Sequence, residues 1–142
     1  MKTGLLAFVF LLASCSSMHV RIHATSSVNR DQHDVPQSVA LHVFQLKDIA
    51  AFNSARLVPL FDNPSEVLGG DMLSDRELFI QPGQQQYFSA SLLPGAKFIG
   101  VVAAFRHHQR LPWRQFAVIK AENRYTNERI YIQLSAAGLK VK

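Results

Sequence analysis

The chain has 142 residues, a formal net charge of +5 and one cysteine. This length suits a single domain with a hydrophobic core. Its 15 Lys and Arg residues are scattered, without a basic run or an aromatic-basic module, which argues against a nucleic-acid-binding protein. A mildly basic surface better suits anionic headgroups or an acidic protein partner.

The N-terminus has the organisation of a bacterial lipoprotein signal, or lipobox. Lys2 supplies positive charge, residues 5–12 are apolar but too short to span a bilayer comfortably, and small residues precede Cys15. This pattern predicts cleavage before Cys15 and acylation of its sulfur and its new amino group, so that two or three acyl chains anchor the protein. An ordinary secretory signal with a chance cysteine is the alternative.

These features divide the chain into three parts. Residues 1–14 are the predicted signal peptide, residues 15–18 a lipidated tether, and residues 19–142 the folded domain. Ser16, in place of an Asp after the acylated cysteine, favours the outer membrane with the domain facing the periplasm. Because acylation consumes the only thiol, the fold must be held by burial rather than by disulfides.

Seven segments have the spacing and composition of β-strands. They are residues 19–24, 39–43, 75–81, 84–92, 97–106, 113–120 and 129–134. Turns such as Pro82-Gly83 and Pro94-Gly95 separate them. Residues 97–106 are apolar at both odd and even positions, which predicts a central strand covered on both sides. Short strands punctuated by turns predict an all-β sandwich, with Phe105 and Trp113 in its core.

Residues 48–69 interrupt this pattern with helical spacing. Asp48 can cap a first helical segment, and Asn63 followed by Pro64 is typical of another helix start. Gly69 and Gly70 then end the helical region. The sequence therefore predicts a small helical insertion between the second and third strands, and we expect it to close one end of the sandwich as a lid.

Motifs for catalysis, phosphate binding and metal binding are missing from the sequence, so we predict neither an enzyme nor a cofactor. His19 and His23 share a strand face, but four strand residues span about 13 Å, too far for one metal ion. The adjacent pair His107-His108 is more typical of a solvated loop than of a metal site.

Several segments occur in an order that resembles one known family. Besides the lipobox they are Val39 to Asp48, Phe52, Leu68 to Leu73, Gln81 to Gly83, Phe98 to Arg106, and Trp113-Arg114. Together they resemble the TssJ family, the outer-membrane lipoproteins of type VI secretion systems, over nearly the whole mature chain. After the predicted strand at residues 97–106, many relatives would show an acidic residue, whereas this chain has His107 to Arg110.

The resemblance implies a transthyretin-like β-sandwich of about seven to eight strands with added helices. It also implies a non-enzymatic role, in which the lipoprotein tethers the inner-membrane protein TssM through its periplasmic C-terminal part, in a complex completed by TssL. A generic outer-membrane lipoprotein that binds a small ligand or peptidoglycan is the alternative. A concave aromatic pocket would favour that alternative, and a flat polar loop end would favour the tether.

Strand counting suggests where a partner would bind. If consecutive strands alternate in direction, residues 29–37, 82–84 and 107–112 cluster at the end far from Cys15, and the helical insertion, Pro94-Gly95 and residues 122–127 lie at the membrane end. Residues 29–37 form a long polar loop, which is either a docking surface or merely a connection between strands. The candidate partner-binding residues are Asn29, Arg30, Asp31, Gln32, His33, Asp34, Gln84, His107, His108, Gln109 and Arg110.

Overall fold

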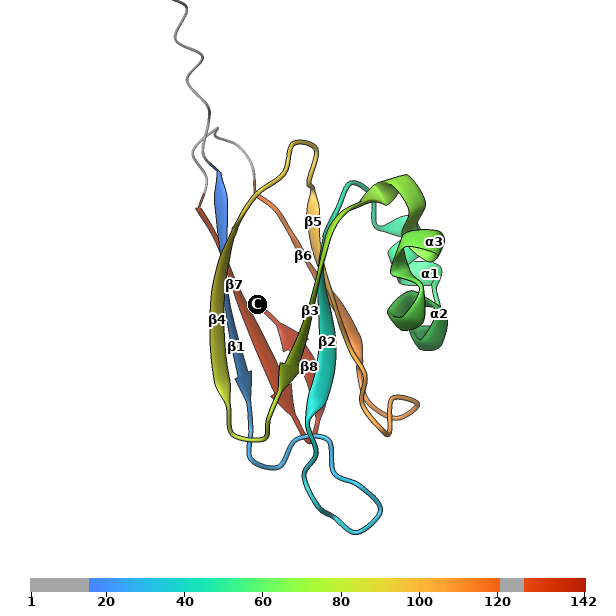
Figure 1. Ribbon diagram of the computed structural model, residues 1–142, viewed down its shortest axis with the longest axis vertical. Helices are drawn as coiled ribbons and strands as arrows, with labels where there is room; N and C mark the ends of the chain where they lie inside the picture. The colour runs from blue at the N-terminus through green and yellow to red at the C-terminus, as the bar shows by residue number, and fades with distance from the viewer. Residues whose placement is uncertain (1–15, 121–126) are drawn as a thin grey trace, which may run out of the picture.

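The computed structural model describes residues 16–120 and 127–142. These residues form eight strands in two four-stranded sheets that pack face to face, which confirms the predicted sandwich (Figure 1). Sheet A has the order β4-β1-β7-β8, and sheet B the order β3-β2-β5-β6. The strands of sheet A are β1 (Ser17–Ala24), β4 (Gln85–Ser91), β7 (Asn127–Ser135) and β8 (Gly138–Val141). Those of sheet B are β2 (Val39–Leu46), β3 (Met72–Ile80), β5 (Phe98–Ala103) and β6 (Arg114–Val118).

Sheet A has two features that the sequence analysis did not predict. β8 was not among the seven predicted segments, because its four residues give too short a pattern to identify. β1 pairs in parallel with β7, whereas it pairs antiparallel with β4. A parallel pair between the first strand and one more than a hundred residues later leaves no local signal.

The main core fills the space between the sheets. Alternate residues of the strands point inward, for example Val20 and Ile22 from β1 and Leu41 and Val43 from β2. Phe105 is 3% exposed and belongs to this cluster, as predicted. Trp113 is only half-buried, and it packs against both this cluster and a second one.

The second cluster joins the helices to the outer face of sheet B. The helical region comprises α1 (Ala50–Ser54), α2 (Leu57–Asp62), α3 (Pro64–Leu68) and a 3-10 turn, η1 (Gly69–Asp71). Phe52, Leu60 and Leu68 from the helices pack on Phe44 and Val102 of the sheet, all at most 3% exposed. The predicted insertion is confirmed, but its expected position is wrong: the helices lie along a face of the sandwich rather than closing one end (Figure 1).

Apolar residues on both sides of β2 and β5 explain this position. The inward side of β5 carries Ile99, Val101 and Ala103, while Val102 points to the helices, which confirms a central strand covered on both sides. Gly100 lies under α1, because a Cβ there would come within 2.8 Å of Cε2 of Phe52. A lid over one end would have left this second apolar face exposed to water.

The described loops lie at the ends that strand counting predicts, but the helical insertion, which was expected at the membrane end, lies along the outer face of sheet B. At one end, the amide of Leu92 donates to the carbonyl of Ser16, so the turn at Pro94-Gly95 lies near the start of β1. The opposite end, which we call the distal end, consists of residues 25–38, 81–84, 104–113 and 136–137, shown at the bottom of Figure 1. Backbone hydrogen bonds join these segments to one another and to β8, including Gly83 to Thr25 at 3.2 Å and Leu139 of β8 to Pro112 at 2.8 Å.

Residues 1–14 and Cys15, the basis of the lipoprotein prediction, lie outside the described residues, as do residues 121–126 of the predicted membrane-end loop. Within the part of the chain that is described, no helix has both the length and the apolar character needed to cross a membrane.

Candidate partner-binding end

Asn29 connects the two long loops of the distal end. It is 6% exposed and has a positive φ of 50°, a conformation that Asn tolerates better than most residues. Its side-chain amide donates to the carbonyl of Ser38 at 2.8 Å, and its Oδ1 accepts the backbone N–H of Arg106 at 2.8 Å. One buried side chain thus joins residues 25–38 to residues 104–113.

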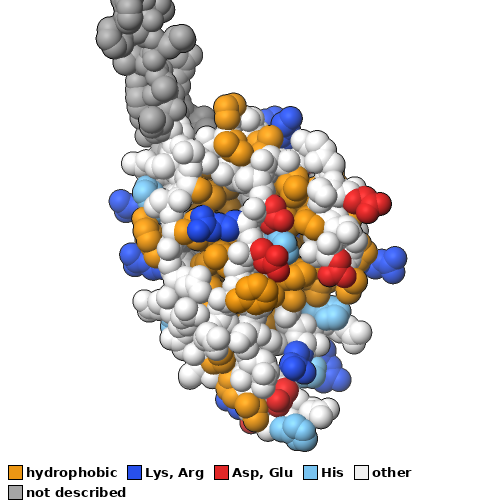
Figure 2. All heavy atoms as spheres, in the orientation of Figure 1, with side chains coloured by type: hydrophobic (Ala, Val, Ile, Leu, Met, Phe, Trp, Pro, Cys, Tyr) orange, Lys and Arg blue, Asp and Glu red, His pale blue; other side chains and the backbone are white. Residues whose placement is uncertain are grey.

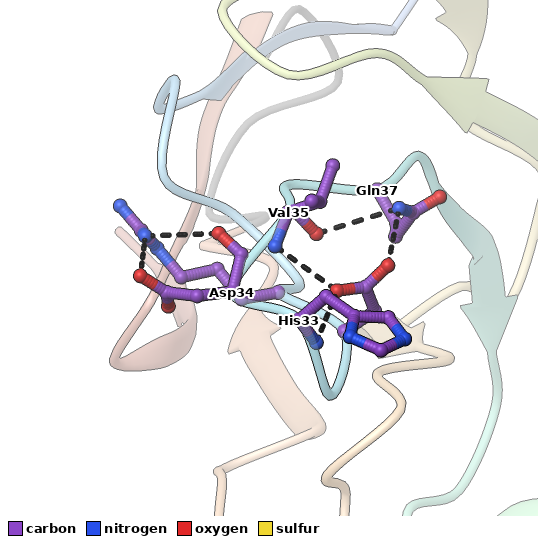
Figure 3. A network of polar contacts seen from close by, with 6 residues as sticks. His33, Asp34, Val35 and Gln37 are labelled. Atoms are coloured by element: carbon purple, nitrogen blue, oxygen red, sulfur yellow. Dashed lines mark hydrogen bonds and ion pairs between the residues drawn. The ribbon is translucent and has the colours of Figure 1, made fainter.

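A network of polar contacts that includes His33, Val35 and Gln37 lies at the tip of the first loop (Figure 3), and Asp31 is its centre. Its carboxylate accepts the backbone N–H of Val35 at 3.0 Å and of His33 at 2.8 Å, and the side-chain amide of Gln37 at 3.1 Å. The hydrogen bond from Val35 contributes most to lowering the pKa of the Asp31 carboxyl below its usual range, opposed by partial desolvation. Hydrogen bonds within the loop therefore hold its tip in one conformation.

Arg30 and Asp34 form an ion pair on the same loop. Nη1 of Arg30 lies 2.7 Å from Oδ2 of Asp34 and also donates to the Asp34 carbonyl at 3.2 Å. The Asp34 side chain is 80% exposed, so this pair contributes little to stability. It nevertheless limits the orientation of the Arg30 guanidinium at the surface.

A cavity of about 220 Å³ lies between the two loops. Asn29 and Arg30 line it from the first loop, and His107 and Arg110 from the second. Leu111 and Ala136 complete its lining, and sequence analysis had identified neither as a site residue. Ala136 belongs to the turn before β8, and it could not be placed here without knowing that β8 exists.

The other predicted site residues have different environments. Oε1 of Gln84 accepts the backbone N–H of Gln81 at 2.8 Å, so this side chain is used within its own turn. The side chains of Gln32 and His33 contact each other at 3.2 Å at the exposed tip of the first loop. Gln109 is exposed on the second loop.

His107 and His108 do not act as a pair. His108 is half-buried and lines a separate cavity of about 530 Å³ with Trp113 and residues 55–59 on the helical side. The described residues contain no group of three or more His, Cys, Asp or Glu side chains placed to hold a metal ion.

His42 and Asp75 form a buried contact that sequence analysis did not identify. Nδ1 of His42 lies 2.6 Å from Oδ1 of Asp75, and its ring is stacked on Phe44 and meets the edge of Phe61 at 4.4 Å between centroids. The His42 side chain is 5% exposed, and that of Asp75 is 24% exposed. Aromatic side chains cover the His42 ring, so we interpret the pair as a support for the helices rather than a reactive site.

Comparisons with known proteins identify the family. The family model described as type VI secretion lipoprotein, VasD, EvfM, TssJ matches residues 16–137. A comparison with curated protein sequences gave no match. Among solved structures, the TssJ1 lipoprotein of Pseudomonas aeruginosa is 25% identical with a TM-score of 0.83, covering 90% of this chain and 95% of that one.

Two further structures are similar. A chain of a type VI membrane complex is 29% identical with a TM-score of 0.76, covering 89% of this chain and 97% of that one. A chain of a structure described as the TssM C-terminal domain from EAEC is 24% identical with a TM-score of 0.67, with the same coverage, and shows the fold alone. The resemblance read from the ordered segments is thus confirmed, and this chain belongs to the TssJ family of type VI secretion lipoproteins.

Proposed function

We propose that the protein is a non-enzymatic tether, anchored to the periplasmic face of the outer membrane through an acylated Cys15. Its distal end binds the periplasmic C-terminal part of TssM and so connects the outer membrane to the type VI secretion membrane complex. The likeness to a chain of a type VI membrane complex supports this assembly. The partner assignment also draws on the family resemblance.

The main support for the proposal is that Asn29 links two loops by hydrogen bonds at the end of the sandwich opposite the start of β1. The two hydrogen bonds of Asn29 hold Arg30 and Arg110 around one cavity before any partner arrives. Such preorganisation lowers the ordering cost of binding. The distal end is also the part farthest along the strands from Ser17, two residues after Cys15, so it suits a partner that comes from the inner membrane.

The docking test uses the purified C-terminal region of TssM and isothermal titration calorimetry. We expect Arg30→Gln/Arg110→Gln to weaken binding about tenfold or more, because central charged contacts dominate interfaces of this kind. The matched control is Lys47→Gln/Arg56→Gln, which removes two exposed cations elsewhere and should bind like the wild type. Equal affinity of both variants with an unchanged circular dichroism spectrum would place the contact elsewhere.

The anchoring test is separate. Cys15→Ser removes the sulfur that accepts the diacylglycerol, so we expect loss of labelling by a fatty-acid probe and a soluble periplasmic protein. Labelling of the Ser variant at the wild-type level would contradict the anchor.

The cavity beside Trp113 favours the alternative of a small ligand or peptidoglycan fragment. Trp113 is the single tryptophan, so its fluorescence reports directly on an occupant of that cavity. A saturable change with peptidoglycan fragments, together with no binding to TssM, would favour this alternative over the tether.

A further inference from the structure

The outer face of sheet A carries a concentration of positive charge. Helices cover the outer face of sheet B, whereas the described residues place no helix over sheet A (Figure 1). Its outward positions include four exposed cations and two exposed tyrosines, which we call the cationic face: Arg21, Arg129, Lys140, Lys142, Tyr87 and Tyr131. Figure 2 shows Lys and Arg side chains along the margin of the molecule that carries β4 and β1.

Strand pairing arranges these side chains in a row across the sheet. Arg21 of β1 pairs with Tyr87 of β4 on one side and with Tyr131 of β7 on the other. The backbones of Tyr131 and Lys142 exchange hydrogen bonds of 3.0 and 2.9 Å. Tyrosine and cation therefore alternate over four neighbouring positions, with strands about 4.8 Å apart. The Arg21 guanidinium carbon lies 5.9 Å from the centroid of the Tyr131 ring.

No carboxylate side chain neutralises this face among the described strand residues. The one acidic residue in the strands of sheet A is Glu128, which alternates to the inward side and accepts the backbone N–H of Lys120 at 2.9 Å. Within residues 16–120 and 127–142, no ion pair involves Arg21, Arg129, Lys140 or Lys142. In Figure 2 the visible acidic side chains gather over β3 and the helices and at the lower loop.

We propose that the cationic face binds the surface of a bilayer that contains anionic phospholipid. Its cations lie on or directly after three neighbouring strands, β1, β7 and β8, so the charge spreads in two dimensions, as does the charge of such a bilayer. Each Lys or Arg near an anionic surface contributes about 1 kcal/mol, or about fivefold in partitioning. Tyrosine side chains favour the headgroup region because their rings are apolar and their tips polar.

The position of the face along the chain also favours the bilayer. β1 begins at Ser17, two residues after Cys15, so about 7 Å of extended chain separates the strand from the anchor site. A lipid attached there places the start of β1, and Arg129 beside His19, close to the headgroups. Shallow cavities of about 240 and 270 Å³ lie on either side of Tyr131 and provide room for headgroups between the cations. The loops of the distal end remain free, because they project beyond the strands.

The test measures how strongly the cationic face binds vesicles when the acyl anchor is absent. Residues 16–142 contain both sheets and every residue of the two buried clusters, so this part holds the complete described core. The partition coefficient is measured by co-sedimentation with vesicles of phosphatidylcholine and phosphatidylglycerol, at about 0.1 M salt, where the screening length is about 10 Å. We expect binding that disappears on vesicles of phosphatidylcholine alone.

Lys140→Gln/Lys142→Gln should then reduce partitioning about 25-fold, and Arg21→Gln/Arg129→Gln should do the same. The matched control Lys47→Gln/Arg56→Gln changes the net charge equally but lies off the face, and it should retain nearly all binding. Equal losses in the control and the face variants would overturn the proposal, since net charge alone would then explain them. Binding to isolated peptidoglycan without binding to the vesicles would also overturn it. Failure of TssM binding would leave this result unaffected, because the two surfaces share no residue.

Discussion

The outer faces of the two sheets have the same alternating strand geometry but opposite surroundings. Outward positions of β2 and β5 carry Phe44, Leu46 and Val102, and three short helices cover them. Outward positions of β1 and β7 carry Arg21 and Tyr131 among others, and within the described residues no helix lies over them. The strands themselves are therefore not what decides whether a face is covered.

The difference lies in which side chains occupy every second position. A face of large apolar side chains costs about 1.5–3 kcal/mol for each one left in water, so it must be covered. A face of arginine, lysine and tyrosine is stable in water and remains available for an external partner. One sheet thus binds part of its own chain, and we infer that the other binds something outside the chain.

The largest expected effect tests the covered face. Phe52 is fully buried, and its ring packs edge-on against Phe44 with centroids 6.2 Å apart. Phe52→Ala should lower the free energy of unfolding by about 3–5 kcal/mol, because it leaves a cavity between α1 and the sheet. Tyr131 lies on the cationic face and is 48% exposed, so Tyr131→Ala should lower the free energy of unfolding by only about 0.5–1 kcal/mol. Urea denaturation measures both, and similar losses would remove the contrast between the faces.

A second pair tests how closely α1 approaches β5. Gly100→Ala places a Cβ within 2.8 Å of the Phe52 ring and 2.9 Å of Cδ1 of Leu46, so we expect a loss of about 1–3 kcal/mol. Gly70→Ala is the control, since its Cβ would meet nothing within 4 Å. Thermal unfolding should separate the two variants by several degrees, and coincident melting curves would mean that the helices shift freely.

The smallest effect concerns the polar attachment of α1. Nη1 of Arg114 donates to the carbonyls of Phe52 at 2.8 Å and Ala55 at 2.7 Å, which ties the helix to β6. Arg114→Gln should lose about 1 kcal/mol, because those carbonyls can still bind water. Arg21→Gln on the cationic face should leave the free energy of unfolding within about 0.5 kcal/mol of the wild type. If Arg21→Gln proved the more damaging change, the cationic face would have a structural role that we do not assign to it.

Local patterns in the sequence determined much of the fold. Alternation identified the strands around Val20, Leu41 and Ile132, and apolar residues at both parities marked β5 as covered on both sides. The change to helical spacing placed the insertion at residues 48–69, against helices and a 3-10 turn observed at 50–71. Each of these signals lies within one segment, and side-chain periodicity follows directly from local backbone geometry. The order of the segments also sufficed to identify the family.

Features made by distant segments were decided only by the tertiary structure. The bonds of Asn29 to Ser38 and to Arg106 cannot be read from the residues around Asn29, because they depend on two loops meeting at the distal end. The cationic face joins Arg21, Tyr131 and Lys142 only because β1 lies beside β7, in parallel, and β8 follows at the edge. Strand pairing thus brings lysines and arginines that are scattered along the chain onto one surface. The composition and periodicity of a single segment do not predict which strands pair.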